Sequence, residues 1–153
     1  KNNPHHLRNY LVTEYLIGEK YSSDILADNG KIIHSIQRSN GINPKLNPPT
    51  QYAEIVNYQD IKNFNQKICE HFRIDNFAQI EVGRDSEGVL KIIEINARLD
   101  ATLPITMGLG HNYYDYLIYK QLFGEFPQIE DNWRPGTFFY RYWNNGFTKN
   151  GSS

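Results

Sequence analysis

The stretch Ile92-Ile93-Glu94-Ile95-Asn96-Ala97-Arg98, preceded by Ile80-Glu81-Val82, says more about this chain than any other part of it. Both segments alternate between apolar and polar residues, as half-buried strands do. The residues Asp85-Ser86-Glu87-Gly88 between them are typical of a turn. The pattern therefore predicts a β-hairpin whose second strand ends near Ala97.

The hairpin places three oxygen-bearing side chains on one face of the sheet. With a two-residue loop at Glu87-Gly88, Glu81 lies opposite Glu94, and Asn96 lies two residues further on the same face. A four-residue loop would slide the register by two and keep all three on that face. Because like charges placed opposite each other destabilise a sheet, this arrangement favours a bound cation. Hard oxygen ligands of this kind suit Mg²⁺ or Mn²⁺.

The alternative is an ordinary solvated sheet face, where glutamates are common and lysines neutralise them. Arg98, one step beyond the predicted strand, favours the metal site, because a fixed cation beside a metal suits phosphate or carboxylate oxygens. The alternative role for Arg98 is that of an ordinary surface arginine.

Length and composition restrict the class of protein. The chain has 153 residues, enough for one domain with a real core. Its net charge of −1 gives no electrostatic case for nucleic acid or an anionic membrane. We find no apolar run of the roughly 18 residues that a membrane helix needs, and no apolar core of a signal peptide near the N-terminus. The single cysteine, Cys69, fits a cytoplasmic location.

Alternation, helical spacing and turn residues predict the remaining elements. The expected strands cover residues 10–17, 21–27, 32–38 and 137–143, with the Asn29-Gly30 pair as a hairpin tip; the expected helices cover 59–73 and 112–124, and residues 39–50 form a loop that is a candidate lid. These elements make an α+β domain with a largely antiparallel sheet and two main helices.

Helical spacing also predicts which faces are buried. Ile61, Phe64, Ile68 and Phe72 form the expected apolar face of the first helix. The second helix begins at Asn112 as its cap and ends at Gly124, with Leu117, Ile118 and Leu122 as its buried stripe.

Several segments together resemble a known superfamily. These are Glu14-Tyr15-Leu16-Ile17-Gly18, the run Tyr21 to Gly30, Glu81, and the motif Ile93-Glu94-Ile95-Asn96-Ala97-Arg98. In order and spacing they are similar to the C-terminal part of an ATP-grasp domain, in particular of the carbamoyl-phosphate-synthase-like ligases. The likeness covers residues 9 to 124, and its Glu-x-Asn-x-Arg motif is fairly specific.

The resemblance implies an ATP-dependent, ADP-forming carboxylate–amine ligase that acts through an acyl phosphate. It implies that Glu81, Glu94 and Asn96 hold Mg²⁺ or Mn²⁺, and that Arg98 holds the transferred phosphoryl group or the substrate carboxylate. The backbone of Glu14, Tyr15, Leu16 and Ile17 would meet the adenine of ATP. The implied partners are ATP, small carboxylate and amine substrates and the remainder of the enzyme, with no nucleic acid and no membrane.

The sequence departs from the superfamily in several places. Lys20 stands where relatives carry a glutamate that contacts the ribose, so either Glu19, one step before it, substitutes or nucleotide binding is altered. Ala97 replaces a typical proline. The first lobe of an ATP-grasp domain is not present in these residues. We therefore expect a lobe over 9–145 with a flexible segment at 1–8 and a disordered tail at 146–153, weak nucleotide binding and no turnover by the chain alone.

Other candidate residues have ordinary explanations beside the functional ones. We expect His34 to be structural and Cys69 to be buried packing rather than a nucleophile. Arg38 on the Asn-Gly hairpin could contact phosphate or form a surface salt bridge, and Thr102 could contact substrate or be a plain loop residue. The aromatic strand at 137–143 favours core packing over a nucleic-acid platform.

Two further classes of function are compatible with the residues alone. One is a non-catalytic α+β module that binds another protein, with its acidic sheet face in solvent. The other is a regulatory domain that binds a divalent cation. Stabilisation by Mg²⁺ or Mn²⁺ would separate the metal-binding classes from the first of these.

Overall fold

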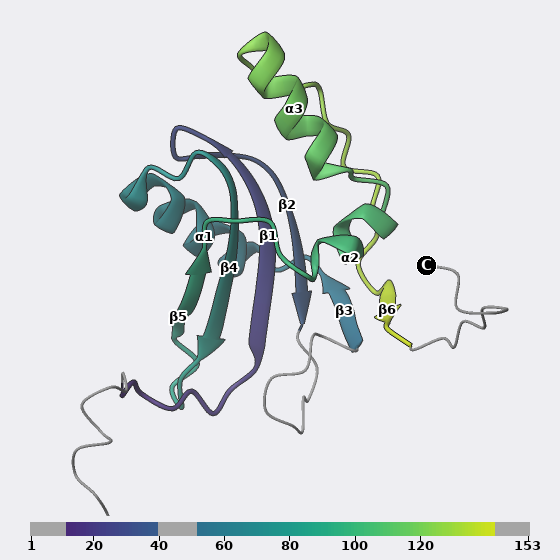
Figure 1. Ribbon diagram of the computed structural model, residues 1–153. Helices are drawn as coiled ribbons and strands as arrows, with labels where there is room; N and C mark the ends of the chain where they lie inside the picture. The colour runs from purple at the N-terminus through teal and green to yellow at the C-terminus, as the bar shows by residue number, and fades with distance from the viewer. Residues whose placement is uncertain (1–11, 40–51, 143–153) are drawn as a thin grey trace, which may run out of the picture.

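A six-stranded antiparallel sheet dominates the part of the chain that the computed structural model describes, residues 12–39 and 52–142 (Figure 1). The strand order is β5-β4-β1-β2-β3-β6. The strands are β1 (Lys20–Asp28), β2 (Lys31–Ser39), β3 (Tyr52–Val56), β4 (Asn76–Arg84), β5 (Leu90–Asn96) and β6 (Phe138–Tyr140), and the helices are α1 (Gln59–Phe72), α2 (Leu103–Gly108) and α3 (Tyr113–Phe123). The predicted α+β fold with an antiparallel sheet is confirmed.

The predicted hairpin around Asn29-Gly30 is formed by β1 and β2. Both tip residues have positive φ, +50° for Asn29 and +91° for Gly30, as a tight two-residue turn requires. A Cβ atom on Gly30 would lie 3.1 Å from the backbone oxygen of Cys69, so the tip also packs closely on the end of α1. This hairpin forms the centre of the sheet.

The two faces of the sheet carry separate cores. On one face, alternate residues of the central strands pack on α1 through Ile25, Ile61, Ile68 and Ile80. On the other, Leu26 and Phe77 pack on Leu103 and Tyr113, and Ile36 and Ile55 pack on Ile105. Because α2 and α3 cover only part of this second face, the polar residues near β5 are left accessible beside them.

Some predicted elements differ from the structure. A strand was predicted at 10–17, but residues 12–17 are irregular, and the first strand of the sheet, β1, starts at Lys20. The last strand is shorter than the predicted 137–143, while β3 and α2 were not predicted. Short elements of this kind carry too few periods for the pattern to separate them from loops. Most of the candidate lid and the segments 1–8 and 146–153 lie outside the described residues.

Helix ends were predicted better than helix faces. The Asn112 side chain accepts a hydrogen bond from the Tyr114 amide, and Gly124 ends α3 with a φ of +82°. The predicted buried stripe is wrong for Ile118 and Leu122, which are 58% and 70% exposed. The apolar residues of α3 are spread around the helix, so spacing alone could not select the face that packs on the sheet.

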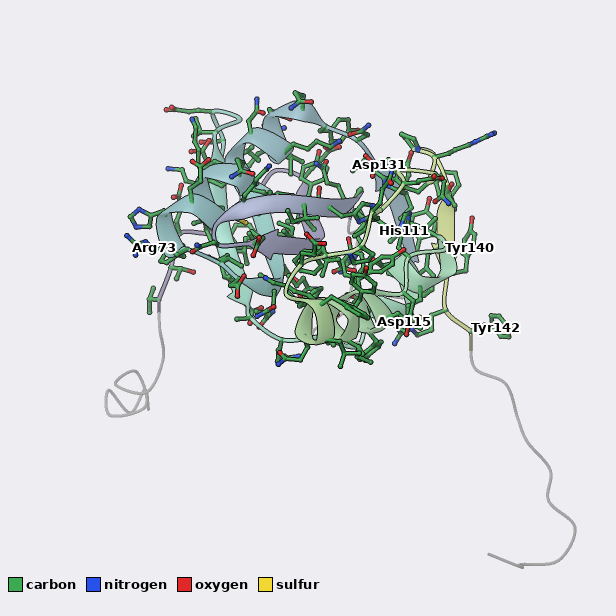
Figure 2. The ribbon with its side chains drawn as sticks, turned by 90° about the horizontal axis from the view of Figure 1, so that it is seen from above. Arg73, His111, Asp115, Asp131, Tyr140 and Tyr142 are labelled. Atoms are coloured by element: carbon green, nitrogen blue, oxygen red, sulfur yellow. The ribbon has the colours of Figure 1, made fainter. Side chains whose placement is uncertain are left out.

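One residue of the first helix also departs from the prediction. Ile61 and Ile68 are buried in α1, but Phe72 is 58% exposed in the last turn. Arg73 follows in the left-handed conformation and turns the chain away toward β4. Figure 2 shows Arg73 on the opposite side of the molecule from His111, Asp131 and Tyr140. No helix of the described residues is long and apolar enough to cross a membrane.

Candidate functional site

The β4–β5 hairpin places the predicted oxygen donors together. Glu81 pairs directly with Glu94, and Gln79 pairs with Asn96. Because side chains alternate along a strand, all four residues project from the same face, toward the loop that precedes α2. The predicted juxtaposition of Glu81, Glu94 and Asn96 is therefore present, while their role as metal ligands stays a prediction.

The pairing of Glu81 with Glu94 is as expected, but the turn of the hairpin differs from the predicted two-residue loop. Arg84 pairs with Leu90, so the loop is longer than two residues, and the Asp85 carboxylate accepts hydrogen bonds from the amides of Glu87 and Val89. A β-bulge between the Glu81–Glu94 and Val82–Ile92 pairs then adds one residue to β5 and restores the expected pairing. The bulged residue, Ile93, is 42% exposed.

Burial and the charge of Glu94 both disfavour the ionised form of Glu81. Burial of Glu81 raises the pKa of its carboxyl group, and the negative charges of Glu94 and Asp100 raise it further. Arg38 and a hydrogen bond from Ser22 act in the opposite direction and lower this pKa. The effects that raise the pKa of Glu81 outweigh those that lower it, so ionised Glu81 lacks sufficient positive charge around it. A divalent cation would supply that charge.

Next to the carboxylates lies a partly buried network of polar side chains centred on Thr102. The Thr102 hydroxyl accepts hydrogen bonds from Arg38 and, at 2.8 Å, from the Gln79 amide, and it donates to Asp100 at 2.7 Å. The Gln79 carbonyl in turn accepts from the Asn96 amide at 3.3 Å. This chain of contacts joins the loop before α2 to both strands of the hairpin.

A fully buried ion pair supports this network from below. Arg38 and Asp24 have no exposed side-chain surface, and their nearest charged atoms are 2.9 Å apart. The Thr106 hydroxyl donates to the same Asp24 oxygen at 2.6 Å. Arg38 is therefore a buried residue rather than the surface salt bridge that the sequence allowed. A charge this deeply buried is tolerated only when it is paired and hydrogen-bonded, so the pair is a fixed part of the floor.

Sequence reasoning missed two members of this network. Gln79 lies two residues before Glu81 on the same strand. The alternation that places the Glu81 side chain on this face of the sheet therefore places Gln79 there as well. Asp100 lies two residues beyond Arg98, in an irregular segment where no period applies. Arg98 itself is exposed and forms no ion pair within the described part of the chain, which leaves its guanidinium available to an anion.

The segment predicted to meet the nucleotide base lines a cleft beside the β4–β5 hairpin. Thr13, Glu14, Tyr15, Leu16 and Lys20 line a cleft of about 530 Å³, together with Phe64 of α1 and residues 90–93 of the hairpin. The Lys20 ammonium lies 5.7 Å from the centre of the Tyr15 ring. Neither Ile17 nor Glu19 lines the cleft, and the Glu19 carboxylate instead accepts a hydrogen bond from Tyr21.

The cleft and the carboxylates share the β4–β5 hairpin. Phe64 of the cleft belongs to the α1 layer, but Leu16 and Ile93 also line the cleft, and both approach Gly83, two residues beyond Glu81 on the face that carries the carboxylates. The described residues thus bring the three metal candidates together, and four of the six nucleotide candidates line a cleft beside the same hairpin.

The donor set fits Mg²⁺ or Mn²⁺ better than a metal that prefers sulfur or imidazole ligands. The described residues contain no group of three or more histidine, cysteine, aspartate or glutamate side chains placed to hold a metal ion. Two carboxylates and one amide carbonyl remain, and Mg²⁺ is commonly held by one or two carboxylates together with substrate phosphates and water. The uncompensated charge at Glu81 supports this assignment.

Two predictions of ordinary structural roles agree with the structure. His34 is buried and contacts the Tyr113 hydroxyl at 2.7 Å; its burial and the neighbouring His111 lower its pKa to about 4. Cys69 is buried in the α1 core, which raises the pKa of its thiol to about 11. Neither residue therefore has the properties of a reactive group at neutral pH.

A sheet of this topology with a Glu-x-Asn-x-Arg hairpin defines an ATP-grasp protein. The chain belongs to the family described as ATP-grasp in the biosynthetic pathway with Ter operon, whose model matches residues 6–137. The membership expected from the sequence is confirmed, and the carbamoyl-phosphate-synthase-like assignment is consistent with it. No curated protein sequence is significantly similar to the chain.

Solved structures share this fold at low sequence identity. L-amino acid ligase from Bacillus licheniformis matches with a TM-score of 0.55 and 14% identity, over 71% of this chain and 30% of its own. The biotin carboxylase domain of 2-oxoglutarate carboxylase from Hydrogenobacter thermophilus, solved with MgADP and bicarbonate, gives 0.59 and 14%, over 81% and 29%. The phosphoribosylaminoimidazole carboxylase ATPase subunit from Aquifex aeolicus gives 0.58 and 13%, over 74% and 35%. The chain thus spans about a third of the length of these proteins.

Proposed function

We propose that the chain is the ATP- and Mg²⁺-binding portion of an ADP-forming carboxylate–amine ligase. In this reaction a carboxylate oxygen attacks the γ-phosphorus of ATP, and the bond to the β,γ-bridging oxygen breaks to release ADP. The amine then attacks the acyl carbon of the acyl phosphate, phosphate leaves with the bridging oxygen, and the amine loses a proton. Family membership and the solved ligase support the class, while the small carboxylate and amine remain unspecified.

The observation that carries the proposal is the Glu81–Glu94 pair with Asn96 beside it. Two carboxylates directly opposite each other on neighbouring strands, with the pKa of Glu81 raised, form an anionic site that is unfavourable without a cation. Bound Mg²⁺ would neutralise charge on the phosphates during transfer, which is the main catalytic requirement of phosphoryl transfer. The chain's own residues position that ion and exclude part of the solvent around Glu81.

The other predicted residues take separate parts in the proposal. The exposed guanidinium of Arg98 would hold the transferred phosphoryl group or the substrate carboxylate. The irregular backbone at 14–17 would meet the base, since its amides and carbonyls are not used in the sheet. Lys20, which lines the cleft, is better placed than Glu19 to contact the nucleotide. The remainder of an ATP-grasp enzyme would complete the pocket, in a cytoplasmic setting.

The decisive measurement is Mn²⁺ binding to the purified chain, followed by the loss of the free-ion electron paramagnetic resonance signal. We expect one site in the wild-type chain that Mg²⁺ displaces. Glu94→Gln should weaken this binding at least tenfold, because it removes one of the two carboxylates. Glu87→Gln is the matched control, since it removes the same charge from the exposed turn of the same hairpin. Equal binding by Glu94→Gln and the control would refute the proposal.

The interaction-module alternative predicts a solvated acidic face without metal binding. Partial burial of Glu81 and its raised pKa argue against such a face. The same titration decides between the two, because a module of this kind predicts no saturable Mn²⁺ site.

A further inference from the structure

Thr102 stands at the N-cap of α2 but does not cap it. A threonine at this position ordinarily accepts a hydrogen bond from an amide of the first turn. Here the hydroxyl makes no such bond, and it is used instead by Arg38, Gln79 and Asp100. Its one donor and two acceptor positions are all filled by side chains. The residue gives up a common stabilising contact to occupy the centre of the network.

The charged residues fix the direction of every hydrogen bond at Thr102. The Asp100 carboxylate can only accept, so the hydroxyl must donate to it. Arg38 can only donate, so the hydroxyl must accept from it. One acceptor position remains, and the group that faces it must be a donor. Gln79 therefore turns its NH₂ group toward Thr102 and its carbonyl oxygen away.

The orientation of the Gln79 amide in turn fixes the orientation of the Asn96 amide. The Gln79 carbonyl needs a donor, and the Asn96 NH₂ group supplies it at 3.3 Å. The amide of Asn96 is planar, so when its nitrogen faces Gln79 its Oδ1 atom faces the other way. This leaves Oδ1 free of Gln79, on the face of the sheet that also carries the Glu94 carboxylate, two residues before it. An oxygen placed there can bind a cation, whereas an NH₂ group would repel it.

We propose that Thr102 is a positioning residue, which orients the Asn96 amide through Gln79 so that its oxygen faces the metal site. The inference rests on the proposed function, because it assigns the orientation of one of the proposed ligands. The buried Asp24–Arg38 pair holds the fixed end of this chain of contacts, and Asn96 is its open end.

The test is Mn²⁺ affinity in Thr102→Val and Thr102→Ser, with thermal melting as a check on folding. Valine matches threonine in shape but has no hydroxyl, so we expect a 10- to 100-fold weaker Kd, as is typical for lost partners of metal ligands. Serine keeps the hydroxyl and should bind within about threefold of wild type. Gln79→Met, which breaks the chain one step later, should weaken binding to a similar degree even if Thr102→Val does not fold.

A double-mutant cycle separates orientation from general structural damage. In an Asn96→Asp background both carboxylate oxygens can bind the ion, so no orientation is required. Thr102→Val should then change the Kd by less than about threefold in this background. An equal loss in both backgrounds, or unchanged affinity in Thr102→Val with normal wild-type binding, would overturn the inference alone. Absence of Mn²⁺ binding in the wild-type chain would overturn the proposed function and this inference with it.

Discussion

Replacing Glu81 by glutamine tests the electrostatics of the site in both directions. The pKa of Glu81 is raised above its ordinary value of 4.5, so the folded chain binds this proton more readily than the unfolded chain. The corresponding stability is present below pH 4.5 and is lost as the pH rises through the folded pKa. At pH 7 the ionised group therefore costs stability. We expect Glu81→Gln to melt higher than wild type in metal-free buffer, and Mn²⁺ to reverse that order.

The magnitude follows from the cross-strand pairing. A like-charge pair directly opposite in a sheet costs up to about 1 kcal/mol, and the exposure of Glu94 keeps the cost within that range. For a chain of 153 residues, this corresponds to a rise in Tm of about 2 to 4 °C. Mn²⁺ at 100 times its Kd should stabilise the wild-type chain by about 2.7 kcal/mol, which is a larger effect in the opposite sense.

The assay is thermal melting at pH 7 and pH 4, with a chelator and with Mn²⁺. Glu87→Gln again serves as the control, because it changes the net charge equally without touching Glu94. The rise in Tm of Glu81→Gln should shrink at pH 4, where wild-type Glu81 is largely protonated. A lower Tm than wild type at pH 7 in chelator would refute the account of the Glu81–Glu94 pair.

Three other outcomes follow from the packing. Gly18→Ala should destabilise the chain by about 1 to 3 kcal/mol in urea unfolding, because its Cβ would lie 2.7 Å from the Arg84 backbone oxygen, whereas Gly108→Ala meets no atom within 4 Å and should be nearly neutral. Cys69 should resist a thiol reagent at pH 8 in the folded chain and react in urea. Since the pKa of His34 is lowered to about 4, stability should fall as the pH drops from 6.5 toward 4, and His34→Gln should flatten that part of a pH–Tm profile.

The fold could be predicted wherever a local signal and a long-range constraint agreed. The Asn29-Gly30 tip and the Gly124 helix end need a positive φ, which few residues favour, and the Asn112 side chain caps the start of α3, so these positions could be read directly. The exposed face of α3 could not, because Ile118 and Leu122 are as apolar as the residues that pack on the sheet.

The candidate site shows a similar division. The pairing of Glu81 with Glu94 was predicted from alternation, although the turn and the bulge that produce it were not. The floor of the site depends on contacts between residues far apart in sequence, such as Arg38 with Thr102. No period links such residues, so only the folded arrangement shows that they form one network.

The bulge in β5 has a practical consequence for protein engineering. The bulge adds one residue to β5 just before Glu94. The pairing of the residues nearer the sheet centre is therefore set independently of the length of the hairpin tip. A peptide epitope or fluorescent tag inserted between Glu87 and Gly88 should therefore leave the acidic pair aligned. The tip thus offers an attachment point for a reporter on the same hairpin as the proposed ion site.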